Sequence, residues 1–258
     1  PEPTIGANSD TQADDHFNTV LYTGNNSTNN ITGVGFQPDW VWVKKRSTAG
    51  DHKLIDSTRG VGQVLESNTT DSEADESSSF TAFGADGFSL AGTAGAWNEN
   101  AYNYVAWNWK ANGGTTTTND ASSSGIGTVD STFQSNQASG FSIVSYTGTG
   151  EALTVKHGLN VAPDLVIVKN RDITQNWIFG HSALWDLNVN NLLLLNGTNT
   201  TITNSAIWNN ARPTSSVFSV GADTATSGNG NSIIAYCFAE VESYSKFGSY
   251  TGNGSADG

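Results

Sequence analysis

The sequence predicts an all-β protein made of tandem β-sandwich repeats of the jelly-roll-like type. Three observations support this prediction: short runs of β-branched and aromatic residues, clusters of Gly, Asn, Asp and Ser between them, and an internal repeat. Six or seven predicted strands in roughly 100 residues, with frequent turns, are typical of a sandwich or jelly roll. A long helical protein would instead be rich in Ala, Glu, Lys, Leu and Arg.

The internal repeat consists of three landmarks that recur in the same order, which indicates a repeat architecture. The first landmark is FNTVLYTG at 17–24, which recurs as FSIVSYTG at 141–148 and begins a third time at Phe247. The second is the run PDWVWVKKR at 38–46, which recurs as PDLVIVKNR at 163–171. The third is the apolar strand that closes each unit, at 104–110 and 233–239.

These landmarks divide the chain into segments. The predicted segments are a linker at 1–16, sandwich repeat 1 at 17–111, a linker at 112–140, sandwich repeat 2 at 141–242 and the start of a third repeat at 243–258. The segment 112–140 is rich in Gly, Ser and Thr, a composition typical of flexible, solvated linkers. Because the chain starts at Pro1 and the third repeat stops after its first strand, we expect both ends to be internal to a longer chain.

Within the units, the predicted strands follow the apolar runs. In the first unit they lie at 17–23, 39–46, 52–56, 62–67, 86–91 and 103–110. In the second unit they lie at 141–147, 152–156, 164–170, 176–181, 191–196, 216–220 and 232–240. Asp86-Gly87 between apolar runs predicts a hairpin turn. Helix is expected at most as a minor element near 183–190.

The composition argues against several classes of protein. The chain has 24 acidic and 11 basic residues and a formal net charge of −13, whereas nucleic-acid binding requires a basic surface. No apolar run approaches the roughly 18 residues of a membrane-spanning helix, so we expect no membrane insertion. A single cysteine can form neither an internal disulfide nor a multi-thiolate metal site.

Eight tryptophans raise the question of sugar-stacking platforms. Four of them alternate within predicted strands, so that each pair shares a face: Trp40, Trp42, Trp107 and Trp109. In the second unit their counterparts are Leu165, Ile167, Tyr236 and Phe238. A large apolar face that recurs in both units, opposite a small one, favours a place in the core.

The other four tryptophans lie nearer to predicted loops. We retain them as candidate ligand-binding aromatics: Trp97, Trp177, Trp185 and Trp208.

No residue pattern indicates catalysis. A Gly-x-Ser-x-Gly elbow is absent, and Cys237 lies in mid-strand between apolar neighbours, where a buried thiol is inert. Glycoside hydrolysis needs two carboxylates across one bond. The repeat-matched acids Asp39 and Asp164 instead each follow a proline, which indicates a role in a turn or at the start of a strand. We therefore predict no catalytic residue.

No residue pattern indicates a metal or cofactor site either. The four histidines lack the spacing of zinc ligands. The acidic cluster at 71–76 could bind calcium, but it lacks the spacing of an EF-hand loop, and a solvated acidic loop is the favoured interpretation. We therefore predict no metal site and no cofactor.

The landmark motifs also carry a resemblance. They are FxxVxYTG, then ITGVGFQPDWVWVK at 31–44 and YVAWNWKA at 104–111, with matching runs in the second unit up to residue 258. They resemble a tandem-repeat β-domain of unknown function found in tail-fibre-type structural proteins of marine tailed phages, including cyanophages. The likeness covers about 17–111 and 141–258.

The resemblance implies a non-enzymatic structural protein of the virion, on the surface of an extracellular particle. A tail fibre or adhesin that takes part in attachment to the host is the leading hypothesis, with other virion proteins as partners and a host surface glycan as a possible ligand. By resemblance we expect a homo-oligomer, a trimer, although no coiled-coil heptad supports it. The alternatives are a capsid-decorating (head fibre) protein and a secreted carbohydrate-binding module.

Overall fold

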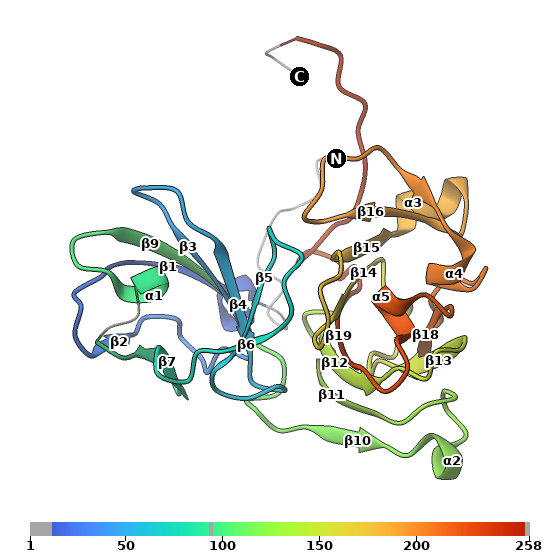
Figure 1. Cartoon of the computed structure of the whole chain (residues 1–258), viewed down its shortest axis with the longest axis horizontal. Helices are drawn as coiled ribbons and strands as arrows, with labels where there is room; N and C mark the ends of the chain where they lie inside the picture. The colour runs from blue at the N-terminus through green and yellow to red at the C-terminus, as the bar shows by residue number, and fades with distance from the viewer. Residues whose placement is uncertain (1–11, 93–94, 256–258) are drawn as a thin grey trace.

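The computed structural model describes residues 12–92 and 95–255, which form two β-rich units side by side (Figure 1). The all-β prediction is confirmed, because antiparallel sheets carry each unit and the helices are short. The predicted strands are present in both units, with ends that differ by a few residues at most.

The first unit is a sandwich of two sheets. Its main sheet has the order β1 (Phe17–Thr23), β9 (Asn103–Trp109), β3 (Trp40–Lys45), β4 (His52–Asp56), β5 (Gln63–Glu66) and β6 (Ala74–Asp75). The smaller sheet has the order β2 (Asn29–Ile31), β8 (Gly87–Leu90) and β7 (Phe80–Gly84). The short helices are η1 (Ala13–Asp15) and α1 (Gly95–Asn98). The hairpin predicted at Asp86-Gly87 joins β7 to β8, where Gly84 pairs with Gly87.

The second unit repeats this plan with more strands. Its main sheet has the order β10 (Thr117–Asn119), β11 (Ser131–Asn136), β12 (Phe141–Thr147), β19 (Ser232–Phe238), β14 (Leu165–Asn170), β15 (Ile178–His181), β16 (Asn191–Leu194) and β17 (Ile202–Thr203). The smaller sheet pairs β13 (Leu153–Lys156) with β18 (Val217–Val220). The helices are α2 (Ala121–Ser124), α3 (Ser182–Leu187), α4 (Ser205–Trp208) and α5 (Thr224–Ser227).

The internal repeat is reproduced at the level of single hydrogen bonds. The Tyr22 hydroxyl donates to the Trp97 carbonyl at 2.8 Å, and the matching Tyr146 hydroxyl donates to the Thr226 carbonyl at 2.7 Å. These bonds tie the first-landmark strand of each unit, β1 or β12, to the short helix that precedes the unit's last strand. The repeated tyrosine is therefore an anchor of the sandwich.

The glycine that ends the first landmark is required by close backbone approach. A Cβ on Gly24 would lie 2.1 Å from the Glu99 carbonyl oxygen, and a Cβ on Gly148 would lie 2.4 Å from that of Gly228. We expect Gly24→Ala to lower the free energy of unfolding by about 1–3 kcal/mol, because backbone must shift. Urea denaturation measures this, with Gly248→Ala as the control, since no atom lies within 4 Å of a Cβ there. Equal stability of the two variants would contradict the prediction.

The linker predicted at 112–140 is largely ordered, which corrects the expectation of a flexible segment. Strand β11 pairs with β12 over six residues, from Ser131 opposite Tyr146 to Asn136 opposite Phe141, and β10 pairs with β11. Phe133 on β11 joins the second core. The main sheet of the second unit therefore starts at residue 117, with the edge strand β10 followed by β11, although the composition of this segment is polar.

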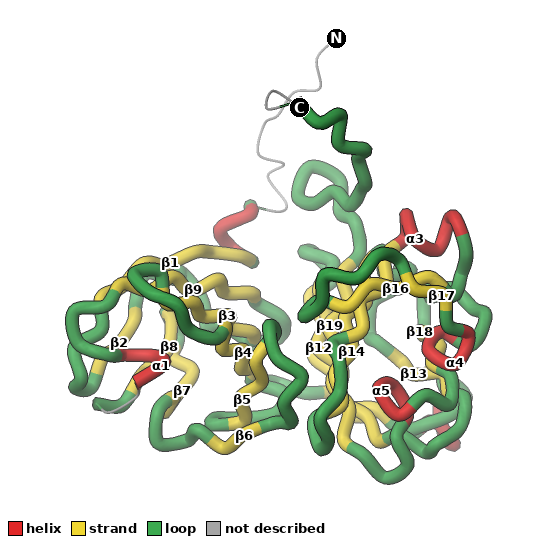
Figure 2. The backbone as a smooth tube through the Cα atoms, turned by 45° about the horizontal axis from the view of Figure 1, so that its top comes forward, coloured by secondary structure: helices red, strands yellow, loops and turns green. Residues whose placement is uncertain are grey.

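The segment 243–258, predicted as the start of a third repeat, forms no strand within its described part, residues 243–255. Figure 2 shows this segment leaving the body of the molecule. In both units the strand of the first landmark pairs with the unit's last strand, β1 with β9 and β12 with β19. Among the described residues after Phe247, no strand is present with which the segment could pair in this way.

The core of the molecule has three parts. Each sandwich has its own core between its two sheets, with Val41 and Val43 in the first and Val166 and Val168 in the second. A third apolar cluster lies between the two main sheets and includes Trp40, Leu54, Ile167 and Tyr236. The outer faces of the main sheets are therefore packed against each other, and the two units form one body.

Candidate functional site

The four loop tryptophans predicted as ligand-binding aromatics are buried. Trp97 and Trp177 are 0% exposed, and Trp185 and Trp208 are 2% exposed. Trp97 lies in the first core, Trp185 and Trp208 in the second, and Trp177 between the units. None of these rings can stack on a ligand in this arrangement, because packing within the protein already covers both faces. This corrects the prediction that they form a binding surface.

Three of the four tryptophans predicted for the core are partly accessible to solvent. Trp40 is buried between the units, but Trp42, Trp107 and Trp109 are only half-buried. Trp42 donates from its indole N–H to Nδ1 of His52 at 2.9 Å and meets Trp107 edge to face. The large apolar face of each closing strand turns away from its own sandwich, and the small face with Ala106 turns inward. A partly open aromatic surface results.

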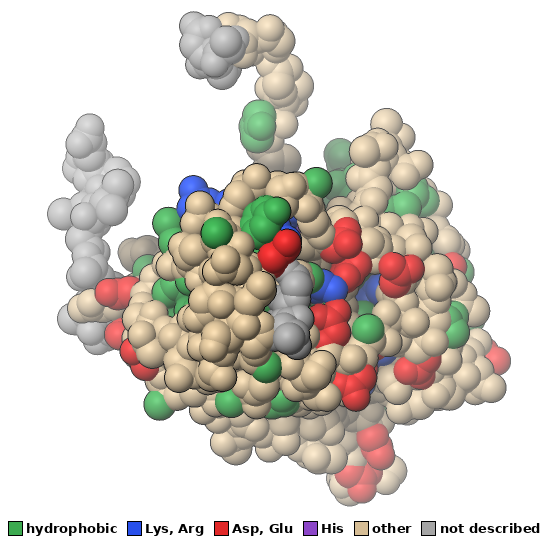
Figure 3. Space-filling view, turned by 60° about the vertical axis from the view of Figure 1, so that its left-hand side comes forward, with side chains coloured by type: hydrophobic (Ala, Val, Ile, Leu, Met, Phe, Trp, Pro, Cys, Tyr) green, Lys and Arg blue, Asp and Glu red, His purple; other side chains and the backbone are tan. Residues whose placement is uncertain are grey.

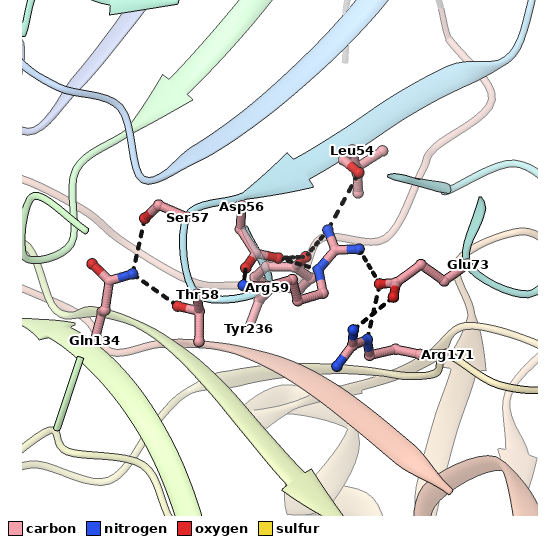
Figure 4. A network of polar contacts seen from close by, with 9 residues as sticks. All are labelled: Leu54, Asp56, Ser57, Thr58, Arg59, Glu73, Gln134, Arg171 and Tyr236. Carbon is pink, nitrogen blue, oxygen red and sulfur yellow. Dashed lines mark hydrogen bonds and ion pairs between the residues drawn. The ribbon is translucent and has the colours of Figure 1, made fainter. Parts of the chain in front are cut away.

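A buried cluster of charges joins the two units (Figure 4). The Arg59 guanidinium, whose side chain is 0% exposed, donates to Asp56 Oδ2 at 2.5 Å and to Glu73 Oε2 at 2.8 Å. It also contacts the hydroxyl of Tyr236 in the second unit at 3.2 Å, and that hydroxyl donates to Asp56 at 2.7 Å. Arg171, also in the second unit, binds Glu73 through two nitrogens at 2.6 and 2.8 Å.

The electrostatics of this cluster favour the charged forms of Arg59 and Glu73. Burial acts to lower the pKa of Arg59, but the neighbouring charges of Asp56 and Glu73 outweigh it, and the pKa is raised. Burial acts to raise the pKa of Glu73, but Arg171 and Arg59 lower it below its usual value. Arg59 and Glu73 are therefore an ion pair at neutral pH.

Further hydrogen bonds attach the 66–76 segment of the first unit to the second. The Trp177 indole donates to the Glu66 carbonyl at 2.8 Å, and the buried Lys169 ammonium donates to the carbonyls of Thr70 and Gln175 at 3.2 and 2.8 Å. Burial lowers the pKa of Lys169 to about 8, against a smaller opposing effect of Asp71. The segment predicted as a solvated acidic loop is thus part of the interface between the units.

The repeat-matched acids play the structural role that the sequence predicts. The Asp39 carboxylate accepts from the backbone N–H of Ala111 at 2.6 Å, and the Asp164 carboxylate accepts from that of Glu240 at 2.8 Å. In both units the carboxylate thereby fixes the chain just after the last strand. Asp39 also accepts from Gly113 and Gly114, which fixes the connection that leads to the second unit.

A cleft of about 420 Å³ opens between the units beside their shared core. Its walls are almost entirely apolar and come from both units and from the C-terminal segment: Phe17, Trp42, Trp109, Phe141, Phe238 and Phe247. Trp109 and Phe238 occupy equivalent positions in the two repeats and approach to 6.4 Å between ring centroids. Flat apolar groups fit such a cleft, and the titratable side chain in its lining is Tyr244, whose pKa is raised by burial.

The comparisons with known proteins give one match. A family model described as a domain of unknown function, DUF7483, matches residues 12–258. The chain belongs to this family. No curated protein and no solved structure matches it.

The single thiol of the DUF7483 chain is buried. Cys237 is 0% exposed within β19, and burial raises the pKa of its thiol to about 12. Among residues 12–92 and 95–255, no group of three or more His, Cys, Asp or Glu side chains is placed to hold a metal ion. In the same part of the chain, no helix has the length and apolar character needed to cross a membrane.

Figure 3 shows a surface on the first-unit side on which uncharged groups predominate.

His157 of the DUF7483 chain gives its stability a pH dependence. The imidazole is 0% exposed, its Nδ1 accepts from the Leu159 N–H at 3.1 Å, and its Nε2 lies 3.1 Å from the Thr214 carbonyl. Both contacts suit the neutral ring with the proton on Nε2, and burial lowers the pKa to about 4. Since the unfolded state takes up its proton near pH 6.5, this contribution is present above that pH and lost as pH falls towards 4.

We therefore expect acidification from neutral pH to pH 4 to cost up to about 3 kcal/mol through His157. Urea denaturation at a series of pH values in this window measures the slope. The His157→Gln variant lacks the titrating group and should show a flatter slope than the unchanged protein. Parallel slopes for the two proteins would show that the imidazole does not contribute.

Proposed function

We propose that this chain is a non-enzymatic structural segment of a tailed-phage virion, most specifically a tail-fibre or adhesin segment that takes part in attachment to the host surface. One observation carries the proposal: two tandem sandwiches share an apolar core and a buried cluster of ion pairs. Independent modules on a flexible linker would bury neither. A rigid block of repeated units suits a structural part that holds other parts at a fixed distance, rather than an enzyme.

The interface between the units also supports the proposal that this protein is stable outside a cell without disulfides. Small extracellular domains commonly depend on disulfides for stability, and this chain has one cysteine. The apolar cluster around Trp40 and Tyr236, together with the Arg59 pairs, provides an alternative source of stability. The resemblance of the landmark motifs to tail-fibre-type proteins supplies the specific setting.

The half-open aromatic surface supports a role in attachment. Rings of Trp42, Trp107 and Trp109 are half-buried, so part of each can meet the apolar face of a sugar ring of a host glycan. Such contacts are weak one at a time. Several copies on one particle would raise the overall affinity through effective concentration.

Antibodies against the folded chain test the proposal in purified phage particles viewed by electron microscopy. Labelling of the tail is the expected result, and mass spectrometry of the same particles should contain peptides of this chain. Labelling of the head would replace the tail fibre with a head-decorating protein. Absence from the particles, with the protein in the medium of uninfected bacteria, would overturn the virion assignment in favour of a secreted carbohydrate-binding module.

A further inference from the structure

Strand β1 forms an open edge of the first unit's main sheet. Within the described residues it pairs with β9 on one side and with no strand on the other. Its counterpart in the second unit, β12, is covered on both sides, by β19 and by β11. The molecule thus contains the same strand twice, once covered and once open.

Residues of β1 are more exposed than the matching residues of β12, because β1 has no neighbouring strand on its outer edge among the described residues. Val144 on β12 is 0% exposed because Phe133 of β11 lies opposite it, whereas the matching Val20 on β1 is half-buried. Tyr146 is 4% exposed, and the matching Tyr22 is half-buried. Leu21 of β1 is 64% exposed, which makes it one of the most exposed leucines of the described chain. The inward-facing residues of β1 have the same chemistry as those of β12 but lack a covering strand.

The edge of β1 also lacks the usual protection against pairing. Proteins protect exposed edges with short strands, bulges, proline or charged side chains, because a free row of backbone groups is a template for another strand. β1 has seven residues, FNTVLYT, none charged and none proline. The other edge strands of the described sheets have two to five residues, and β7 among them has an irregular register.

We propose that β1 docks against β1 of a second copy of this chain, so that two first-unit main sheets join into one continuous antiparallel sheet. An antiparallel pair centred on Val20 places Thr19 opposite Leu21 of the second copy and Asn18 opposite Tyr22. Both copies present the same strand, so the contact closes in a two-fold dimer, the commonest symmetry of homo-oligomers. This goes beyond the proposed function and does not depend on it.

The covered strand β12 supports the geometry of this contact. It shows that a first strand of this repeat accepts an antiparallel neighbour on its outer edge in continuous register over six residues. The absence of charge along β1 means that no like charges meet across the two-fold axis. The net charge of −13 on each chain opposes association at long range, so we expect added salt to strengthen the dimer.

Sedimentation velocity over a wide range of concentration tests the proposal with the full chain. The expected result is a monomer–dimer equilibrium whose dissociation constant rises about tenfold or more in Leu21→Lys, because the charge enters both halves of the pairing. Leu187→Lys is the matched control, since Leu187 is also exposed, at 80%, but lies outside β1. It should leave the equilibrium unchanged.

Hydrogen exchange in the native state provides a second measurement that does not depend on the substitution. Amides of β1 that face away from β9 should exchange slowly at concentrations where the dimer forms and rapidly in Leu21→Lys. A monomer at all concentrations, a stable trimer, or a dimer unaffected by Leu21→Lys would each overturn the proposal.

Discussion

Replacing Arg59 with alanine is expected to lower the free energy of unfolding by about 3–5 kcal/mol. The guanidinium is completely buried and is the shared partner of Asp56, Glu73 and the Tyr236 hydroxyl. Without it, Asp56 stays buried at 0% exposure with no cationic partner among the described residues, and a carboxylate in that state is costly to hold. Urea denaturation followed by tryptophan fluorescence measures the loss.

Lys246→Ala is the matched control for the Arg59 prediction. Lys246 also pairs with a carboxylate, that of Glu240, but its side chain is 83% exposed. Water screens an exposed ion pair, so this variant should remain close in stability to the unchanged protein. A loss below about 1 kcal/mol for Arg59→Ala would show that the buried cluster relaxes or admits water, and would contradict its assigned role.

Trp40→Ala is expected to cost about 3–5 kcal/mol as well, through a cavity rather than through charge. Trp40 is 1% exposed and lies between the units, with its ring centroid 4.3 Å from that of Tyr236 in a stacked pair and 4.4 Å from that of Trp109 in a tilted pair. The loss removes aromatic contacts from both main sheets at once. We therefore expect urea unfolding to proceed in two resolved steps in this variant and in one step in the unchanged protein.

The control is Trp107→Ala, which makes the same chemical change on the neighbouring strand. Trp107 is half-buried and meets Trp42 rather than the second unit. It should cost less than half as much and should leave unfolding in one step. Similar losses for the two variants would mean that the shared core is no more important to stability than the open aromatic surface.

Much of the fold could be predicted because local pattern and internal repetition agree. Strands such as 17–23, 52–56 and 141–147 were predicted at the residues where they occur, since alternation and turn residues bound them on both sides. Strand β11 was missed because its sequence, STFQSN, is polar and resembles its linker surroundings. Pairing with β12, rather than its own composition, makes it a strand.

The two groups of tryptophans show the limit of reasoning from a repeat. Alternation identifies which residues share a face of a strand, but it does not say which face turns towards the strand's own sandwich. In this protein the small face turns inward and the face with Trp107 and Trp109 turns outward, where Trp109 packs towards the other unit and Trp107 meets Trp42. That outcome depends on a third core between units, which neither unit's sequence specifies alone.

The buried charge cluster was also beyond the reach of sequence spacing. Glu73 and Arg171 are separated by 98 residues, and only the packing of the main sheets brings them together. The acidic cluster at 71–76 looks like a solvated loop because most such clusters are. A useful indication was available: Arg171 belongs to a repeated landmark and follows a strand, so a partner for it could be sought.

The chain enters the two-unit body and leaves it at almost the same point. His16, just before β1, and Tyr244, just after the second unit, lie 6.1 Å apart between ring centroids. More than two hundred residues therefore add nearly nothing to the distance between these positions. A pull applied between them would act first on the contacts of His16, which include the ring contact with Tyr244 and the hydrogen bonds with Asn136 and Lys110. In a fibre whose chain runs through both positions, each pair of units would project sideways from the fibre axis. The pair would then add to the width of the fibre rather than to its length.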